Sequence, residues 1–479
     1  MTMKRLFIIT AALAVLTSAA AVERPRLVVG IVVDQMRWDY LYNYQWGEGG
    51  FKRLMDEGYS FEQTLINYVP TTTACGHASI FTGTTPAVHG IAGNNYWVDG
   101  DFRASVADTA LGVSPRNLLT TTIGDQLKLG TDMKGRVIGV ALKDRAAILP
   151  AGHAADGAYW YSGRNHKFVS SSYYGSKVPE WVERFNRDNA STLSKELTMV
   201  PEGVTMTFAL AEAAIENEQL GADDVTDMLT VSISTTDAAA HVLGTYVPRI
   251  DSIYHQLDSD LAHFFSTLDR RVGRGNYLLF LTADHGGTHN MAYMTPRHLP
   301  TGTWDSNEAQ INANKKLEAQ FGVGYLIRAH MLFNVYLDNN LIERHHLDRN
   351  AVADAAMAAL AEDPAVDRVV DFKRLSSTTL PDAMRSRLEM GYYPSRSGDL
   401  FVMVKQGYYG GKPSDKGATH GSWSMPDTHI PWLMMGWHVP HGETTAATTI
   451  ADIAPTVCAM LHIQMPTGCT GHAQPLPHP

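Results

Sequence analysis

Four apolar runs recur along the chain, and each one ends abruptly in polar residues. The runs are RLVVGIVVDQM, RVIGVALKDR, DMLTVSISTTD and NYLLFLTADH, which lead to Asp34, Lys143, Asp237 and Asp284. Uninterrupted apolar runs rich in β-branched residues are typical of strands that are buried on both faces. Several such strands need helices on both faces of their sheet, which favours an α/β fold with a mostly parallel central sheet.

Helical patterns separate these runs. In RIDSIYHQLDSDLAHFFSTLDRRVG the apolar residues recur at helical spacing from Ile250 to Leu268, and Gly273 follows as a stop signal. In open parallel sheets, ligands bind at the carboxyl ends of the strands. The polar residues that end the four runs are therefore placed where a binding site is expected.

Two stretches interrupt the alternation of strands and helices. Residues from about 150 to 200 are rich in Tyr, Ser, Gly and Trp and are predicted to form a loop-rich insertion. Residues from about 300 to 400 contain MLFNVYLDNNLI, DRNAVADAAMAALAED and SGDLFVMVKQGYYG, which predict a small α+β insertion. We therefore expect one catalytic domain over residues 22–479 that carries both insertions.

The first 21 residues have the features of a cleavable export signal. Lys4 and Arg5 precede an apolar run from Leu6 to Leu16, and small residues lead to a predicted cleavage point after Ala21. No later segment approaches the ~20 apolar residues of a membrane-spanning helix, so no membrane anchor is expected. The mature protein is expected to be periplasmic or secreted.

Net charge and cysteine positions restrict the partners further. With 39 basic and 49 acidic residues the formal net charge is −10, the wrong sign for a general nucleic-acid partner. Export to an oxidising compartment predicts a disulfide between the neighbouring Cys458 and Cys469, which leaves Cys75 unpaired. Nothing in the sequence defines an oligomeric state.

Carboxylates and imidazoles cluster at the ends of the apolar runs. Each one alone is more often a helix cap, a turn former or an ordinary surface or core residue. Together they suit zinc or a similar divalent ion, because unpaired charges at the ends of buried strands are costly and metal ions offset that cost. The six residues are enough for two ions: Asp34, Asp237, His241, Asp284, His285 and His420.

The stretch TTTACGHASIFTGTTPAVHGIAGNN, residues 71–95, is the best candidate for a nucleophile. A cysteine phosphatase loop would need an arginine six positions after Cys75, where the chain has Phe81. The chain has no GxSxG serine elbow, and GGKPS at residues 410–414 lacks the earlier glycine of a phosphate-binding loop. A threonine hydroxyl remains, whose high pKa a metal ion would lower.

Taken together, these motifs resemble the alkaline phosphatase superfamily. The matching residues are VVDQMR, PTTTACGH, the NN pair at 94–95, KDR, STTD with its following histidine, ADHGG and ATHGS, in that order. The chain is most similar to the exported PafA-type phosphate monoesterases, which use a threonine nucleophile. The resemblance implies a three-layer sandwich around a mostly parallel sheet, and it covers essentially the whole mature chain.

The resemblance also implies roles for individual residues. Thr73 would be the nucleophile, and Asn94, Lys143 and Arg145 would bind the phosphoryl oxygens. Two zinc ions are implied: one held by Asp237, His241 and His420, and the other by Asp34, Asp284 and His285 with the Thr73 oxygen. The nearby His77 and His89 are left as structural hydrogen-bonding residues.

These roles predict a zinc-dependent alkaline phosphatase that hydrolyses small phosphate monoesters through a covalent phosphothreonine. The cations Lys143 and Arg145 favour the dianionic end of a monoester, although a solvated strand end is the ordinary role of such residues. One alternative is a nucleotide pyrophosphatase or phosphodiesterase of the same superfamily. A metal- or phosphate-binding protein without turnover would not need Thr73, and a serine hydrolase is disfavoured by the missing elbow.

Overall fold

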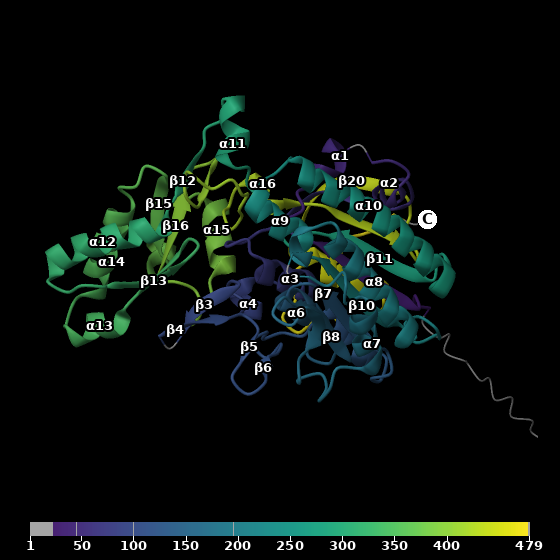
Figure 1. Ribbon diagram of the computed structural model, residues 1–479. Coiled ribbons are helices and arrows are strands. Elements are labelled where there is room, and N and C mark those ends of the chain that lie inside the picture. Colours follow the sequence, from purple (N-terminus) through teal and green to yellow (C-terminus); the bar gives the residue numbers. More distant parts are fainter. Residues whose placement is uncertain (1–22, 45, 99, 195, 478–479) are drawn as a thin grey trace, which may run out of the picture.

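The computed structural model describes residues 23–477 except 45, 99 and 195. The predicted export signal, residues 1–21, lies outside the described residues. The main feature is a ten-stranded mixed sheet with helices on both faces (Figure 1). Its strands run in the order β18, β2, β19, β11, β1, β10, β7, β8 and β9, with β20 paired to β2. Within the described residues, no helix is both long and apolar enough to cross a lipid bilayer.

The four apolar runs form four adjacent parallel strands at the centre of the sheet. These are β1 (Leu27–Val33), β10 (Asp227–Ile233), β7 (Val137–Ala141) and β11 (Tyr277–Thr282), and all their residues are buried. The remaining strands are β2 (Tyr59–Leu65), β8 (Gly157–Ser162), β9 (Lys167–Ser170), β18 (His429–Ile430), β19 (Trp432–Gly436) and β20 (Gly442–Thr449). The predicted α/β fold with a mostly parallel centre is confirmed.

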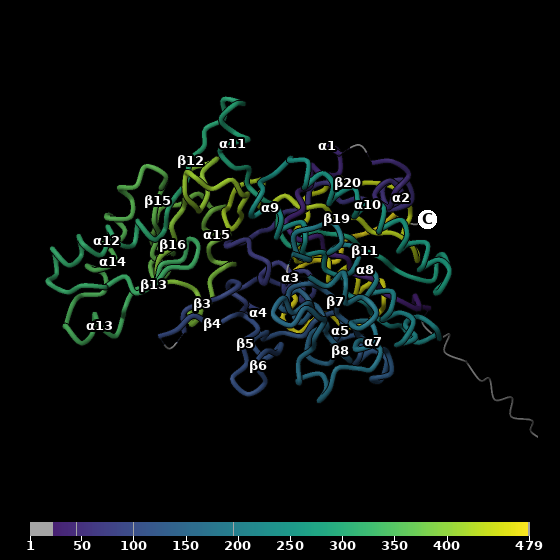
Figure 2. Tube along the Cα trace, in the orientation of Figure 1, coloured from purple at the N-terminus to yellow at the C-terminus, as the bar shows by residue number. Residues whose placement is uncertain are grey.

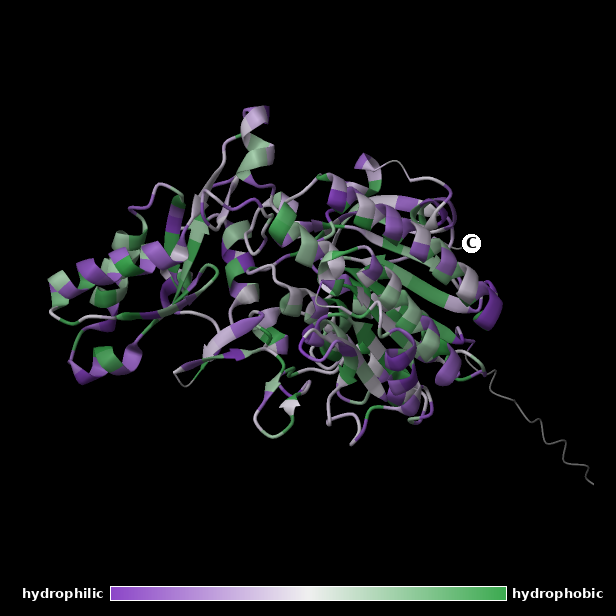
Figure 3. Cartoon of the chain, viewed as in Figure 1, coloured by the Kyte–Doolittle hydropathy of each residue, from purple (hydrophilic) through white to green (hydrophobic). Residues whose placement is uncertain are grey.

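Helices cover the two faces of the sheet in two groups. One group includes α2 (Gly50–Glu57), α8 (Glu202–Asn217), α9 (Thr235–Leu243) and α10 (Pro248–Leu268). The other includes α3 (Thr73–Thr82), α5 (Ile123–Gly130), α6 (Asp144–Ala151) and α17 (Ile453–Met460). The central strands are mostly apolar (Figure 3), and the two helical groups that cover them give the three-layer sandwich.

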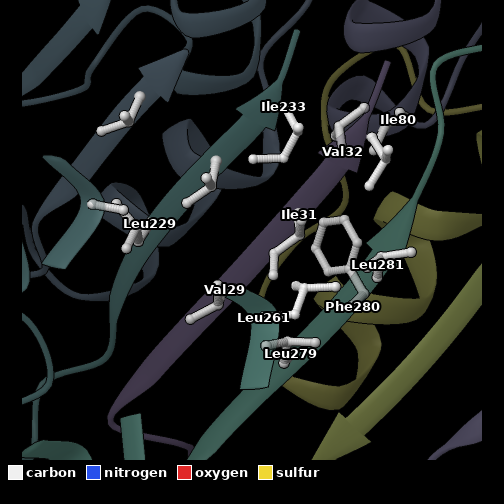
Figure 4. Close-up of a cluster of buried hydrophobic side chains, with 14 of the residues drawn as sticks. Val29, Ile31, Val32, Ile80, Leu229, Ile233, Leu261, Leu279, Phe280 and Leu281 are labelled. Atoms are coloured by element: carbon white, nitrogen blue, oxygen red, sulfur yellow. The ribbon is translucent and has the colours of Figure 1, made fainter. Parts of the chain in front are cut away.

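Close packing on the second face depends on a glycine in the central strand. A Cβ atom at Gly30 would lie 2.6 Å from Cζ of Phe280, its register partner in β11. The Phe280 ring occupies that space and approaches Phe81 of α3, with ring centroids 5.8 Å apart. Figure 4 shows Phe280 and Ile80 of α3 within one cluster of buried hydrophobic side chains. Gly30 therefore lets α3 pack closely over the sheet.

The Tyr- and Trp-rich stretch near residues 150–200 extends one end of the sheet. It contains the antiparallel pair β8 and β9, followed by α7 (Glu180–Asp188) and the short helix η1 (Leu197–Met199). A smaller hairpin, β3 (Asn95–Val98) with β4 (Asp101–Ala104), and the pair β5 (Ala107–Asp108) with β6 (Gly112–Val113) precede it in the chain. Figure 1 shows β5, β6, β8 and α7 in the lower half of the view.

Residues 302–410 form a lobe beside the main sheet. Figure 2 shows this lobe on the left of the view, away from the strands of the main sheet. Its sheet runs in the order β13 (Ile327–Met331), β14 (Asn334–Leu337), β16 (Leu400–Val404) and β15 (Val366–Asp371). The helices are α12 (Ser306–Phe321), α13 (Asn339–Arg344), α14 (Arg349–Leu360) and α15 (Asp382–Gly391). A short parallel pair, β12 (Gly302–Trp304) with β17 (Tyr408–Gly410), closes the lobe around its own hydrophobic core.

The predicted disulfide is wrong in this structure, where all three cysteines are free. Cys458 belongs to α17 and its thiol is fully buried in the core. Cys469 lies in the following loop, and its sulfur is 3.8 Å from the Gly471 carbonyl oxygen and packs beside Gly83. Closeness in sequence alone does not fix the directions of the two side chains, and it misled the prediction.

Candidate active site

Parallel strands bring the predicted site residues together at one edge of the sheet. Asp34 follows β1, Asp284 and His285 follow β11, and Asp237 with His241 lie on α9, which follows β10. Lys143 and Arg145 begin α6 after β7, and His420 lies in the loop between β17 and α16 (Met425–Thr428). Because β7, β10, β1 and β11 are neighbours, their carboxyl ends meet in one place.

Asp237, His241 and His420 form what we call the outer ligand group. Asp237 and His241 are one turn apart on α9, and Nε2 of His241 lies 3.1 Å from Oδ1 of Asp237. Nε2 of His420 lies 3.2 Å from Nε2 of His241 and 3.6 Å from the same Asp237 oxygen. The three side chains thus direct one ligand atom each at a common point.

The tautomers of His241 and His420 direct two nitrogen lone pairs at this common point. Nδ1 of His241 lies 3.0 Å from the Ala418 carbonyl oxygen, and Nδ1 of His420 lies 2.6 Å from that of Thr71. A carbonyl oxygen can only accept a hydrogen bond, so both Nδ1 atoms carry the proton and both Nε2 atoms present lone pairs. Burial holds the pKa of His420 well below its ordinary value, which keeps that ring neutral. Two imidazole lone pairs beside a carboxylate suit a divalent cation.

Asp34, Asp284 and His285 form the inner ligand group, which is buried. Nε2 of His285 lies 3.5 Å from Oδ1 of Asp34 and 3.5 Å from Oδ2 of Asp284. Nδ1 of His285 is 2.9 Å from the Gly286 carbonyl oxygen, so Nε2 again presents a lone pair. The ligand atoms of Asp34, Asp237 and His285 lie within 4.8 Å of one another, so Asp237 adjoins both groups.

The three facing atoms of the inner group are buried and have no hydrogen-bond partner among the described residues: Asp34 Oδ1, Asp284 Oδ2 and His285 Nε2. Nδ1 of His77 is 3.2 Å from Asp284 Oδ2, but it donates to the closer Thr73 carbonyl oxygen at 2.9 Å. Leaving one buried polar atom unsatisfied costs about 1–3 kcal/mol. Three such acceptors at one point fit a bound cation.

Charge also accumulates around Asp34. Burial raises the pKa of Asp34 well above its ordinary value, and the nearby carboxylates of Asp237 and Asp284 add to that rise. The Lys143 ammonium offsets part of this charge, since Nζ lies 2.6 Å from Asp34 Oδ2 and 2.5 Å from Asp237 Oδ2. Lys143 therefore lies between the inner and the outer ligand groups.

The other two predicted phosphoryl ligands lie at the same edge of the sheet. Nε of Arg145 is buried and has no hydrogen-bond partner among the described residues, so it is a donor without an acceptor. Oδ1 of Asn94 accepts a hydrogen bond of 2.8 Å from the backbone N–H of Ala74. This contact fixes the Asn94 amide beside Thr73 and leaves its NH₂ group as the donating end.

Thr73 is the first residue of α3 and is buried. The first turn of a helix has unpaired N–H groups and a positive dipole end, which favour an anion. Gly76 allows this turn to lie against the inner ligand group, because a Cβ there would be 2.1 Å from the Asp284 carbonyl oxygen. Thr73 thus sits at the helix end that faces the ligand atoms.

The remaining reactive-looking side chains of this segment have structural partners. His77 contacts the Thr73 carbonyl oxygen and the Ser232 hydroxyl, at 2.9 and 2.8 Å. His89 contacts the hydroxyl of Ser79 at 3.0 Å, and burial lowers its pKa to about 3. Burial raises the pKa of the Cys75 thiol to about 12, which agrees with excluding it as a nucleophile.

Sequence reasoning did not single out Gln35, which connects the two ligand groups. Its Nε2 donates to Asp237 Oδ1 at 2.9 Å, and its backbone N–H donates to Asp284 Oδ1 at 3.2 Å. Gln35 has φ of 61°, a left-handed conformation that is uncommon for a residue with a long side chain. Its position directly after Asp34 was the one available signal, and residue type alone does not reveal such a backbone.

A cavity of ≈ 180 Å³ opens beside the outer ligand group. Its lining includes Asn94, His241 and His420, together with Met331 and Leu332 of the lobe. The β13–β14 hairpin of the lobe therefore contributes to the cavity beside the ligand residues. This arrangement defines the class of protein: a metal-dependent hydrolase built on an α/β fold, with candidate ligands for two metal ions, a hydroxyl at a helix N-terminus and cationic groups beside it.

The comparisons with known proteins agree with this class. The sequence profile of the family described as "Type I phosphodiesterase / nucleotide pyrophosphatase" matches residues 28–423. The chain therefore belongs to this family, within the alkaline phosphatase superfamily.

Individual relatives narrow the assignment. The chain is 40% identical to alkaline phosphatase PafA of Elizabethkingia meningoseptica, over 94% of each chain. It is 37% identical to alkaline phosphatase PhoV of Synechococcus elongatus, over 94% of this chain and 92% of that protein. The crystal structure of wild-type alkaline phosphatase PafA superposes with a TM-score of 0.91 at 39% identity, over 94% of this chain and 98% of that one. The chain is thus an enzyme of the phosphatase type, a phosphoric monoester hydrolase.

Proposed function

We propose that the chain is an exported, two-zinc alkaline phosphatase that hydrolyses phosphate monoesters through a phosphothreonine formed on Thr73. The observation that carries this proposal is the meeting of inner and outer ligand atoms next to the first turn of α3, where three of these atoms lack a hydrogen-bond partner in the described part of the chain. The donor set fits zinc, because carboxylate oxygen and imidazole nitrogen are ligands that zinc accepts.

The ligand groups would divide the two ions between them. The outer group, Asp237, His241 and His420, would hold one ion, and the inner group, Asp34, Asp284 and His285, would hold the other together with the Thr73 oxygen. When bound, the ions supply Lewis-acid stabilisation of the charge on the attacking and leaving oxygens.

The chain's own residues account for the remaining steps. Thr73 Oγ attacks phosphorus, the bond from phosphorus to the alcohol oxygen breaks, and the alcohol leaves with a proton. Water then attacks the phosphothreonine, restores the hydroxyl and releases inorganic phosphate. The Asn94 NH₂ group and the cations Lys143 and Arg145 are placed to bind the phosphoryl oxygens at the positive end of the α3 dipole.

Substrate class follows from charge. A phosphate monoester dianion carries one more negative charge than a diester, and Lys143 with Arg145 supplies two cations at the same edge of the sheet. The predicted export signal places the mature enzyme in the periplasm or outside the cell, where it would act on small phosphate esters.

Thr73→Ala tests the mechanism directly. With zinc supplied, the wild-type enzyme should release phosphate from p-nitrophenyl phosphate at alkaline pH. Thr73→Ala should lose roughly 10⁴-fold or more of that rate while elemental analysis finds the same zinc content, and Thr73→Ser should keep much of it. Near-normal turnover by Thr73→Ala would show that the nucleophile is assigned wrongly.

A second candidate function has a specific observation in its favour. The matching family is described by phosphodiesterase and pyrophosphatase activity, so hydrolysis of diesters is the alternative. The ratio of activities on a phosphate monoester and its methyl diester separates the two. Lys143→Ala should slow the monoester much more than the diester, and equal losses on both would remove the basis for a monoesterase.

A further inference from the structure

The cavity next to the outer ligand group has an apolar wall that belongs to the lobe. Met331 and Leu332 line it, and both come from the tip of the β13–β14 hairpin. The lining also includes Asn94, His241 and His420, which the proposed function assigns to phosphoryl and metal binding. The cavity of ≈ 180 Å³ therefore has both polar ligand residues and apolar side chains in its lining.

Leu332 adopts a backbone conformation that its side chain does not favour. Its φ is 50°, in the left-handed region where glycine or asparagine is the usual residue of a tight hairpin turn. A bulky apolar residue at such a position is a strained choice, and residues of this kind concentrate at sites that clamp ligands. Glycine would adopt this backbone conformation with less strain than leucine. The side chain of Leu332 lines the cavity, which indicates a role there.

The hairpin tip is held in place next to the ligand loop. Phe333 is buried and stacks on Trp304, with ring centroids 5.8 Å apart. Gly421, which directly follows the ligand His420, leaves room for Leu332, since a Cβ there would lie 3.2 Å from Leu332 Cδ1. Leu332 is half-buried against the core of the lobe. The apolar wall is therefore supported from behind rather than free to move away.

We propose that Leu332 and Met331 form the wall of a leaving-group pocket that selects phosphate esters of aromatic or other apolar alcohols. The inference rests on the proposed function. There, the phosphoryl group is held by the cations and by α3, and the leaving oxygen lies at the outer ligand group. The organic part of the ester then extends past His241 and His420 into the cavity. There, Leu332 and Met331 contact it. Small polar alcohols leave the wall unused.

The test compares two monoesters that differ in the size of the leaving group. We expect Leu332→Asn, which suits the positive φ but removes the apolar surface, to lower kcat/KM for phenyl phosphate about 10-fold relative to methyl phosphate. Inhibition by inorganic phosphate should stay within about 2-fold, because the phosphoryl contacts are untouched. Met331→Ala should change the ratio in the same direction without altering the turn.

Tyr325→Asn is the matched control, because Tyr325 also has positive φ (61°) in the same lobe but is 75% exposed and lies outside the cavity lining. It should leave the phenyl-to-methyl ratio unchanged. An unchanged ratio in both Leu332→Asn and Met331→Ala would overturn the leaving-group pocket while leaving the phosphatase itself intact. A wild-type enzyme that hydrolyses neither ester would instead contradict the proposed function.

Discussion

The inner and outer ligand groups use the same chemistry in different surroundings. Asp34, Asp284 and His285 are at most 1% exposed, and all three facing atoms lack a hydrogen-bond partner among the described residues. In the outer group the His241 side chain is 39% exposed, although His420 is buried. An ion in the inner group would be enclosed by α3 and the sheet, whereas an ion in the outer group would border the cavity. We therefore expect the first to position the nucleophile and the second to meet the leaving group.

Among the variants that compare the two ligand groups, Asp34→Asn should have the largest effect. Asparagine keeps the shape of Asp34 but removes the charge on the oxygen that faces His285. We expect kcat/KM to fall more than about 100-fold, with one zinc ion per chain lost by elemental analysis. Asp39→Asn is the control, since Asp39 pairs with Arg37 and is not a ligand. Full zinc content in Asp34→Asn would show that the inner group is not a metal site.

His241→Asn should have a smaller and reversible effect. The outer ion would keep Asp237 and His420, and the partly exposed position allows zinc to exchange with solution. We expect a loss of about 10- to 100-fold at limiting zinc that excess zinc largely restores, whereas Asp34→Asn should not be restored. His263→Asn, at an exposed position on α10, is the control. Equal rescue of both ligand variants would remove the distinction between the groups.

Gln35→Ala sharpens the comparison because Gln35 contacts each group through a different part of the residue. The side-chain amide reaches Asp237, whereas the backbone N–H reaches Asp284. Truncation should therefore weaken zinc binding by the outer group about 10-fold and leave the inner group unchanged. Competition with a fluorescent zinc chelator measures both affinities. Weakened binding by both groups would indicate that the left-handed backbone, rather than the amide contact, is what Gln35 provides.

The sheet, and the edge of it where the candidate site residues lie, could be predicted from the sequence for one physical reason. Apolar runs that end in charged residues reveal both a buried strand and the edge where its carboxyl end lies, so the pattern itself assigns Asp34, Asp237 and Asp284 to that edge. Parallel topology then requires these ends to converge. The ligand spacing of Asp237 and His241 is also local, since four residues are one helical turn.

What could not be predicted depends on contacts between distant segments. Leu332 lies beside Gly421 only because the lobe folds back on the ligand loop, and no pattern near either residue indicates it. The positive φ of Gln35 is fixed by its contacts to Asp237 and Asp284, which are far away in sequence. The disulfide prediction also depended on a distant segment, since the Cys469 sulfur lies beside Gly83.

Treatment with a thiol reagent should have the smallest effect, although Cys75 lies in the first turn of α3, two residues after Thr73. It donates to the Ile91 carbonyl oxygen at 3.1 Å, is fully buried, and has a pKa raised by burial to about 12. The raised pKa keeps the thiol protonated at pH 9, and the thiolate forms only as the pH approaches 12. Iodoacetamide at pH 9 should therefore leave phosphatase activity unchanged, with Cys469 alkylated first because it is partly exposed.

Cys75→Ala should keep kcat/KM within about 3-fold, since it removes no charge from either ligand group. Rapid inactivation that Cys75→Ala prevents would show that this end of α3 opens to solvent, and the enclosure attributed to the inner ligand group would then be incorrect.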